Sequence, residues 1–182
     1  MKRAVVFIDV QKDFIDGALG SEIARATISK IAAYAEECAK DSLCEIFATR
    51  DTHDADYLKT LEGQKLPVEH CVFGTAGWQL DSSLSQYAKP KNIINKPTFG
   101  SFHLADAVKA VVSASGDEFE QVELCGFCTD VCVVSNALIL RAALPDVKIV
   151  VHAGLCAGTA PEAHAAALAV MKSCQIDVIE EE

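Results

Sequence analysis

The strongest constraint on the fold of this chain is a repeating order of short apolar runs and helical patterns. Residues 4–10 form a nearly continuous apolar run, which is typical of a parallel strand buried on both faces. Five further runs of this kind lie at residues 44–49, 92–95, 121–124, 147–151 and 176–179. Segments with helical periodicity lie at residues 21–38, 104–113, 131–144 and 159–172. This order predicts βαβ units in an open, mostly parallel six-stranded sheet with helices on both faces, a Rossmann-like three-layer α/β/α fold.

Length and composition restrict the class of protein further. The 182 residues fit a single domain spanning 1–182, and a hydrophobic content of 51% argues against disorder. A formal net charge of −10 argues against nucleic acid as a partner, because binding to phosphates requires clustered Lys and Arg. No apolar segment is long enough to span a membrane, and no signal-peptide core is present, so we expect a cytoplasmic protein without a membrane partner. Its eight cysteines should then remain thiols.

Reactive side chains follow four of the expected strands. In strand order these residues are Asp9, Asp51, Lys96 and Cys132. In an open parallel sheet, ligands bind outside the carboxyl ends of the strands, near the point where the strand order reverses. We therefore expect the four side chains to meet at one edge of the sheet.

Cys132 stands at the start of the helical pattern that follows residues 121–124. Thr129 or Asp130 supplies an N-cap, so that Cys132 falls in the first helical turn, where the helix dipole lowers the pKa of a thiol below about 8.5. Free backbone N–H groups at that turn are also suited to hold an oxyanion. Three other interpretations remain open at this point: an inert buried cysteine, a redox pair formed by Cys125 and Cys128, and half of a zinc site that lacks its second Cys pair.

An Asp and a Lys beside such a cysteine form a plausible nucleophilic site. Asp9 is suited to accept the thiol proton and return it to a leaving amine, and Lys96 is suited to hold the negative charges of Asp9 and the thiolate. The alternative is an ordinary ion pair at the edge of a sheet.

The long connection at residues 51–78 carries a different signal. It contains two carboxylates and two imidazoles, Asp51, His53, Glu62 and His70, and ligands of these types suit Zn, Fe, Mn or Co. Asp51 and His53 would face the same side of an extended segment. Asp54 and Asp56 are rival ligands that the sequence alone does not exclude.

Taken together, these segments resemble a known enzyme family. Residues 7–14 (FIDVQKDF), 95–99 (NKPTF) and 126–133 (GFCTDVCV) resemble the isochorismatase-like cysteine hydrolases. Residues 51–53 (DTH), 66–71 (LPVEHC) and 74–77 (GTAG) are similar to the nicotinamidase branch of that superfamily. The resemblance covers nearly the whole chain, with its motifs in the same order.

The resemblance implies a role for each of these site residues. It implies a catalytic triad of Asp9, Lys96 and Cys132, and an oxyanion hole formed by the backbone N–H groups of Cys128 and Cys132, with a cis peptide between Phe127 and Cys128. It implies that Phe14 packs on the substrate ring. The implied metal ligands are Asp51, His53, Glu62 and His70, of which Glu62 matches a ligand that only some members use.

Two departures from the family pattern concern the site. The position of Cys128 is usually small and apolar in relatives, and this chain places a second thiol there. The segment after His53 lacks an additional histidine that some nicotinamidases use.

The activity implied is hydrolysis of nicotinamide to nicotinate and ammonia through a thioester, as in NAD salvage. It implies a divalent transition metal, zinc in the first place with iron or manganese as alternatives, and a homo-oligomer by analogy with relatives. One alternative is an isochorismatase-like hydrolase acting on another small amide or on an N-carbamoyl or ureido compound. A redox protein using Cys125 and Cys128, and a binding protein without turnover, are the alternatives from other functional classes.

Overall fold

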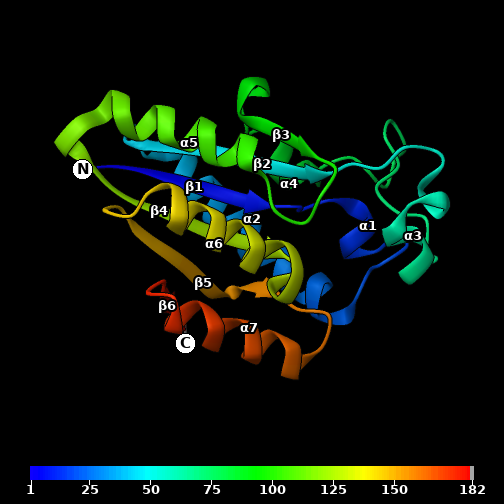
Figure 1. Cartoon of the computed structure of the whole chain (residues 1–182). Helices are drawn as coiled ribbons and strands as arrows, with labels where there is room; N and C mark the ends of the chain where they lie inside the picture. Colours follow the sequence, from blue (N-terminus) through cyan, green and yellow to red (C-terminus); the bar gives the residue numbers. More distant parts are fainter. Residues whose placement is uncertain (181–182) are drawn as a thin grey trace.

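The computed structural model describes residues 1–180 and contains one open sheet whose strands are all parallel (Figure 1). The strand order is β3-β2-β1-β4-β5-β6, with six strands. Their bounds are β1 (Lys2–Ile8), β2 (Cys44–Asp51), β3 (Ile93–Lys96), β4 (Phe119–Phe127), β5 (Lys148–Ala157) and β6 (Asp177–Ile179). The expected α/β fold is confirmed, and the sheet is wholly rather than mostly parallel.

Helices cover both faces of this sheet. The helices α5 (Phe102–Ser115), α6 (Val134–Ala143) and α7 (Pro161–Ser173) lie side by side on one face, and α2 (Glu22–Lys40) lies on the other (Figure 1). The shorter elements are α1 (Lys12–Ile15), η1 (Tyr57–Lys59), α3 (Leu61–Lys65), α4 (Ser82–Ser85), η2 (Pro90–Asn92), η3 (Gly116–Glu118) and η4 (Thr129–Val133). No helix among residues 1–180 has the length and apolar character needed to cross a membrane.

The first strand is the centre of the core, as its apolar sequence predicted. Residues 4–8 have no exposed surface, and β1 pairs in parallel with β2 on one side and β4 on the other. The strand order reverses between β1 and β4, which is where Gly126 passes close to Ile8. A Cβ on Gly126 would lie 2.1 Å from the carbonyl oxygen of Ile8, and Gly126 has a φ of 124°, so this position requires glycine.

The two long helices α2 and α7 begin in different ways. Ser21 caps α2 by accepting a hydrogen bond from the Ala24 N–H. The N-cap of α7 is Ala160, which makes no side-chain cap bond, and the hydroxyl of the preceding Thr159 donates to Asp130.

The segment after β4 also differs from the expected helix. A π-helical turn, η4, contains Cys132, and the regular helix α6 begins only at Val134. Neither expected cap is used, because Thr129 pairs with the His164 ring and Asp130 accepts from the Thr159 N–H. Cys132 therefore lies in a turn whose shape is set by contacts with residues about 30 positions later in the chain.

Candidate active site

The side chains of Asp9, Asp51, Lys96 and Cys132 meet at one edge of the sheet. Asp9 directly follows β1, Asp51 and Lys96 are the last residues of β2 and β3, and Cys132 lies in η4 after β4. The Lys96 Nζ atom lies 2.7 Å from Asp9 Oδ2 and 3.3 Å from Cys132 Sγ. The same Nζ lies 3.5 Å from Asp51 Oδ1. All four side chains are buried, so their charges interact with little screening by water.

Asp9 is held in an unusual backbone conformation at this edge. Its φ is 48°, in the left-handed region that few residue types other than Gly, Asn and Asp adopt. The Asp9 N–H donates to Thr49 Oγ1, and that hydroxyl donates back to Asp9 Oδ1. Burial raises the pKa of Asp9, with Lys96 opposing the rise and the neighbouring Asp51 carboxylate adding to it. Such a carboxylate is well suited to accept a proton.

The pKa of the Cys132 thiol differs from the value expected from the sequence. Burial raises the pKa of its thiol well above the ordinary value, the charge of Asp9 adds to the rise, and Lys96 opposes it. The expected lowering of the pKa was therefore wrong. The thiol is almost fully buried, and it lies before the regular helix rather than inside its first turn. Cys132 then requires a base, and the adjacent Asp9 carboxylate is in a position to be that base.

Lys96 remains a cation at this site. Complete burial works against its charge, but the carboxylate of Asp9, together with Cys132 and Asp51, raises the pKa of Lys96 above its usual range. A permanent positive charge beside both Asp9 and Cys132 lowers the energy of any state in which the proton has left the sulfur.

The residues expected to bind metal form a compact cluster next to Lys96. Each of Asp51, His53, Glu62 and His70 offers one ligand atom, and these atoms all lie within 4.8 Å of one another. His53 Nε2 is 3.0 Å from Asp51 Oδ2 and 3.7 Å from Glu62 Oε1. His70 Nε2 is 3.4 Å from Asp51 Oδ2 and 4.0 Å from Glu62 Oε1. The rival residues Asp54 and Asp56 are exposed and lie outside this cluster.

Contacts around the cluster orient its ligands. His70 Nδ1 lies 2.8 Å from the Val68 carbonyl oxygen, which only accepts, so Nδ1 carries the proton and Nε2 is left with a lone pair. The Gln11 side chain donates to the Asp51 carbonyl and accepts from the Asp51 N–H, at 2.9 and 2.7 Å. Two imidazoles and two carboxylates at these separations match the donor set of a divalent transition metal, so the residues present fit such an ion.

A cavity of about 80 Å³ connects the cluster with the sulfur of Cys132. Its lining includes Asp51, Glu62, His70 and Cys132, together with Phe14, Cys128 and Thr159. The Phe14 ring lies 5.9 Å from the His70 ring, and the Phe127–Cys128 peptide is cis. We refer to this space as the catalytic cavity.

An outer hollow of about 450 Å³ borders the catalytic cavity. The two share Glu62, Leu66, Phe99 and Val131. Leu66 and Phe99 are exposed, so the hollow provides a route from solvent to the site.

Sequence reasoning missed several residues that hold the site. Thr49 binds Asp9, Gln11 binds Asp51, and Asn136 donates to the Cys132 carbonyl. All three are completely buried polar residues. The available signal was a polar residue inside or directly after an otherwise apolar run, because buried polar groups require partners.

Comparison with known proteins places this arrangement among hydrolases. The isochorismatase domain family matches residues 3–182. A pyrazinamidase of Pyrococcus horikoshii in complex with zinc is 26% identical, with full coverage of both chains and a TM-score of 0.81. A nicotinamidase/pyrazinamidase from Bacillus subtilis is 27% identical over 99% of this chain and 100% of its own, with a TM-score of 0.80. A pyrazinamidase/nicotinamidase from Streptococcus mutans is 25% identical over 98% and 100%, with a TM-score of 0.79. A search among curated protein sequences found no significant match.

Proposed function

The chain belongs to the isochorismatase family of hydrolases, and from this premise we propose that it is a metal-assisted cysteine amidase that converts nicotinamide to nicotinate and ammonia. The observation that carries the proposal is the position of the Lys96 ammonium, 2.7 Å from Asp9 and 3.3 Å from Cys132, beside a cluster of two imidazoles and two carboxylates. The nicotinamidases and pyrazinamidases among its structural neighbours support the choice of a pyridine-type amide.

The reaction begins with transfer of the thiol proton from Cys132 to Asp9. Burial raises the pKa of both groups, and the Lys96 ammonium, which contacts Asp9 and Cys132, stabilises the thiolate that the transfer leaves behind. The thiolate then attacks the amide carbon and forms the carbon–sulfur bond. In this step the electron pair of the carbonyl moves to oxygen, where the backbone N–H groups of Cys128 and Cys132 would hold it.

When this intermediate collapses, the proton that Asp9 took from Cys132 passes to the substrate. Asp9 protonates the leaving nitrogen, the carbon–nitrogen bond breaks, and ammonia departs, leaving an acyl group on Cys132. Water then attacks the thioester while Asp9 accepts one of its protons. Nicotinate leaves, and the thiol regains a proton from Asp9.

The cluster of Asp51, His53, Glu62 and His70 would hold a divalent transition metal, with zinc as the first candidate. When bound, such an ion supplies a Lewis acid that anchors the pyridine nitrogen and so orients the ring. Phe14 lines the catalytic cavity beside His70 and would pack on the ring. Asp51 contacts His53 within this cluster and also contacts Lys96, so it would fix the spacing between the ring site and the nucleophile.

An ammonia-release assay with nicotinamide tests the proposal. The wild-type protein should release ammonia, lose activity on chelation and regain it when zinc, iron or manganese is added. Cys132→Ala should reduce turnover to background while far-UV circular dichroism stays unchanged. Cys174→Ala is the matched control, because Cys174 is exposed and far from the site in sequence. Full turnover by Cys132→Ala would contradict the assignment of the nucleophile, and no ammonia release from nicotinamide by the metal-loaded wild type would contradict the substrate.

A further inference from the structure

We infer that a second, apolar chamber beside the catalytic cavity receives a ring substituent, so that the preferred substrates are aromatic carboxamides with an apolar group on the ring. The inference rests on the proposed amidase function, because that function places the amide at Cys132 and the ring nitrogen at the His cluster. It goes further by assigning a chemical class to the rest of the substrate.

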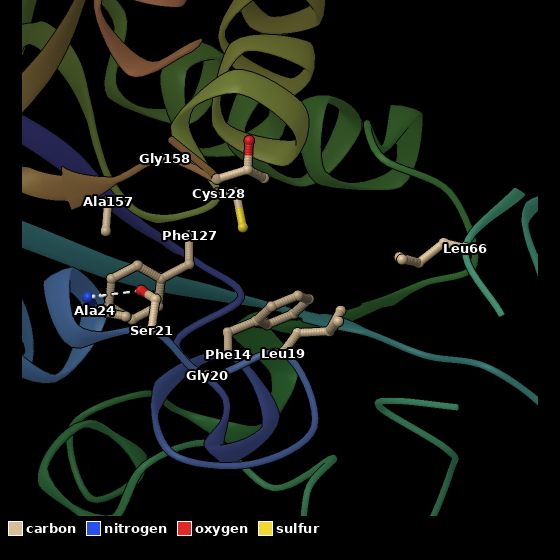
Figure 2. Close-up of a pocket in the computed structure, with 11 residues that line it drawn as sticks. Phe14, Leu19, Gly20, Ser21, Ala24, Leu66, Phe127, Cys128, Ala157 and Gly158 are labelled. Atoms are coloured by element: carbon tan, nitrogen blue, oxygen red, sulfur yellow. Dashed lines mark hydrogen bonds between the residues drawn. The ribbon is translucent and has the colours of Figure 1, made fainter. Parts of the chain in front are cut away.

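The chamber has a volume of about 380 Å³, against about 80 Å³ for the catalytic cavity. Five residues line both spaces, and these are Phe14, Leu19, Leu66, Cys128 and Thr159. Figure 2 shows the sulfur of Cys128 pointing into the chamber from the side opposite Phe14 and Leu19. The two spaces therefore adjoin each other, and we expect a group attached to a ring in the catalytic cavity to extend into the chamber.

The walls of the chamber offer no charge to a ligand. Its remaining lining residues are Gly20, Ser21, Ala24, Phe127, Ala157 and Gly158, so no Asp, Glu, Lys, Arg or His is among those that line it. Two hydroxyls line it: that of Thr159 donates to Asp130, and that of Ser21 accepts from the Ala24 N–H. Burial raises the pKa of the Cys128 thiol to about 12, which leaves it neutral. Transfer of an apolar group from water into such a space is favourable, whereas a charged group would lose its hydration without gaining a partner.

The position of the chamber relative to the metal ligands determines which part of the substrate reaches it. Asp51, Glu62 and His70 line the catalytic cavity and do not line the chamber. A ring whose nitrogen faces these residues turns its opposite edge toward Cys128 and Leu19. The free carbons on that edge are positions 4 and 5 of a nicotinamide, so we expect the substituent at one of these two positions.

The test compares steady-state kinetics on nicotinamide with those on nicotinamides carrying methyl, propyl or carboxylate at position 4 or 5. For at least one of these positions, kcat/KM should rise roughly fourfold for each methylene that enters the chamber. The carboxylate analogue should be hydrolysed more slowly than nicotinamide, because its charge would lose water without gaining a partner.

Variants that fill the chamber provide the second part of the test. Ala24 lies in the first turn of α2 and Ala157 at the end of β5, and both residues line the chamber. Ala24→Leu and, independently, Ala157→Val should reduce the ratio of kcat/KM for the propyl analogue to that for nicotinamide toward one. Ala26→Leu makes the same change at an exposed position of the same helix and should leave the ratio unchanged.

The possible outcomes distinguish a failure of the chamber inference from a failure of the proposed function. Loss of the propyl preference in both filling variants but not in Ala26→Leu supports the chamber. No gain from any alkyl group in a wild-type enzyme that hydrolyses nicotinamide, or a gain that survives both filling variants, overturns it and leaves the amidase assignment intact. A preference for the carboxylate analogue also overturns it. Turnover of the alkyl analogues but not of nicotinamide supports the chamber and removes nicotinamide as the substrate.

Discussion

Thr49 and Asp9 are joined by two hydrogen bonds through a single hydroxyl. The Asp9 N–H donates to Thr49 Oγ1 at 3.0 Å, and the Thr49 hydroxyl donates to Asp9 Oδ1 at 2.6 Å. The other carboxylate oxygen of Asp9 contacts Lys96 Nζ at 2.7 Å. The two carboxylate oxygens are therefore bound by residues of two different strands, Thr49 of β2 and Lys96 of β3. The orientation of the carboxylate toward Cys132 depends on this pair of contacts.

Thr49→Val should impair catalysis more than it impairs substrate binding. Valine has nearly the same shape as threonine but neither donates nor accepts, so Asp9 would lose both bonds. We expect kcat on nicotinamide to fall by about 10- to 100-fold with a small change in KM, and the free energy of unfolding to fall by about 1–3 kcal/mol. Steady-state kinetics and urea unfolding measure the two effects. Thr49→Ser keeps the hydroxyl and should restore most of the activity; wild-type kcat in Thr49→Val would show that Asp9 is oriented without it.

Asn136 should stabilise the turn that carries Cys132. Its side-chain amide donates to the carbonyls of Cys132 and Phe99, at 2.8 and 3.0 Å, and accepts from the Ser101 N–H at 3.0 Å. Asn136→Leu would remove a partner from each of these three backbone groups, two of them in buried bonds, at a cost of about 3 kcal/mol. Thermal and urea unfolding should show this loss, together with reduced kcat. Unchanged stability would mean that the loop after Lys96 and the Cys132 turn do not depend on this amide.

The sheet and the meeting of its reactive residues could be predicted from the sequence because both depend on local patterns. Continuous apolar runs mark buried parallel strands, and a polar residue such as Asp9 or Lys96 at the end of a run marks the carboxyl edge of the sheet. No knowledge of side-chain contacts was needed to infer that these residues lie close to Cys132.

The electrostatics of the site could not be predicted in the same way, because they depend on contacts between distant segments. Asp130 resembles a helix cap in sequence, but its carboxylate binds Thr159, which is 29 positions later. The pKa of Cys132 is raised chiefly by burial and then by the charge of Asp9, a residue 123 positions earlier in the chain. Likewise, the exclusion of Asp54 and Asp56 from the His cluster follows from the path of the loop, in which His53 pairs with Val72.

The metal ligands should differ in their contribution to affinity. His70 is buried, and its imidazole is oriented by Val68, whereas the Glu62 side chain is 24% exposed and lies farther from both histidines than Asp51 does. His70→Ala should therefore lose bound metal almost completely, and Glu62→Gln should retain it with weaker affinity. Metal analysis of the purified proteins and titration of the apo forms with zinc measure this order. Asp54→Asn is the control, and a loss of metal in that variant would contradict the assigned ligand set.

Stability at acid pH should depend on a third buried carboxylate, that of Glu123 in β4. Glu123 accepts hydrogen bonds from Arg3 at 2.8 Å, from His152 at 2.6 Å and from the Tyr34 hydroxyl. Burial favours the neutral acid, but these donors outweigh it and hold the pKa of Glu123 well below its usual range. Because the pKa is lowered in the folded state, this stabilisation is fully present above the pKa of the unfolded chain, near 4.3, and is lost as the pH falls toward the folded value.

Glu123→Gln tests this pH dependence directly. The amide keeps the size of the side chain but removes the charge that its donors stabilise, so the variant should lose about 3 kcal/mol at pH 7. The gap in unfolding free energy between wild type and variant should narrow as the pH falls below about 4, because Glu123 of the unfolded wild-type chain then binds a proton while the folded carboxylate stays ionised. Urea unfolding at pH 7, 5 and 3 measures the gap, and Glu36→Gln, on the exposed face of α2, should show no comparable pH dependence. A gap that stays constant across this range would mean that Glu123 is already protonated in the folded protein at neutral pH.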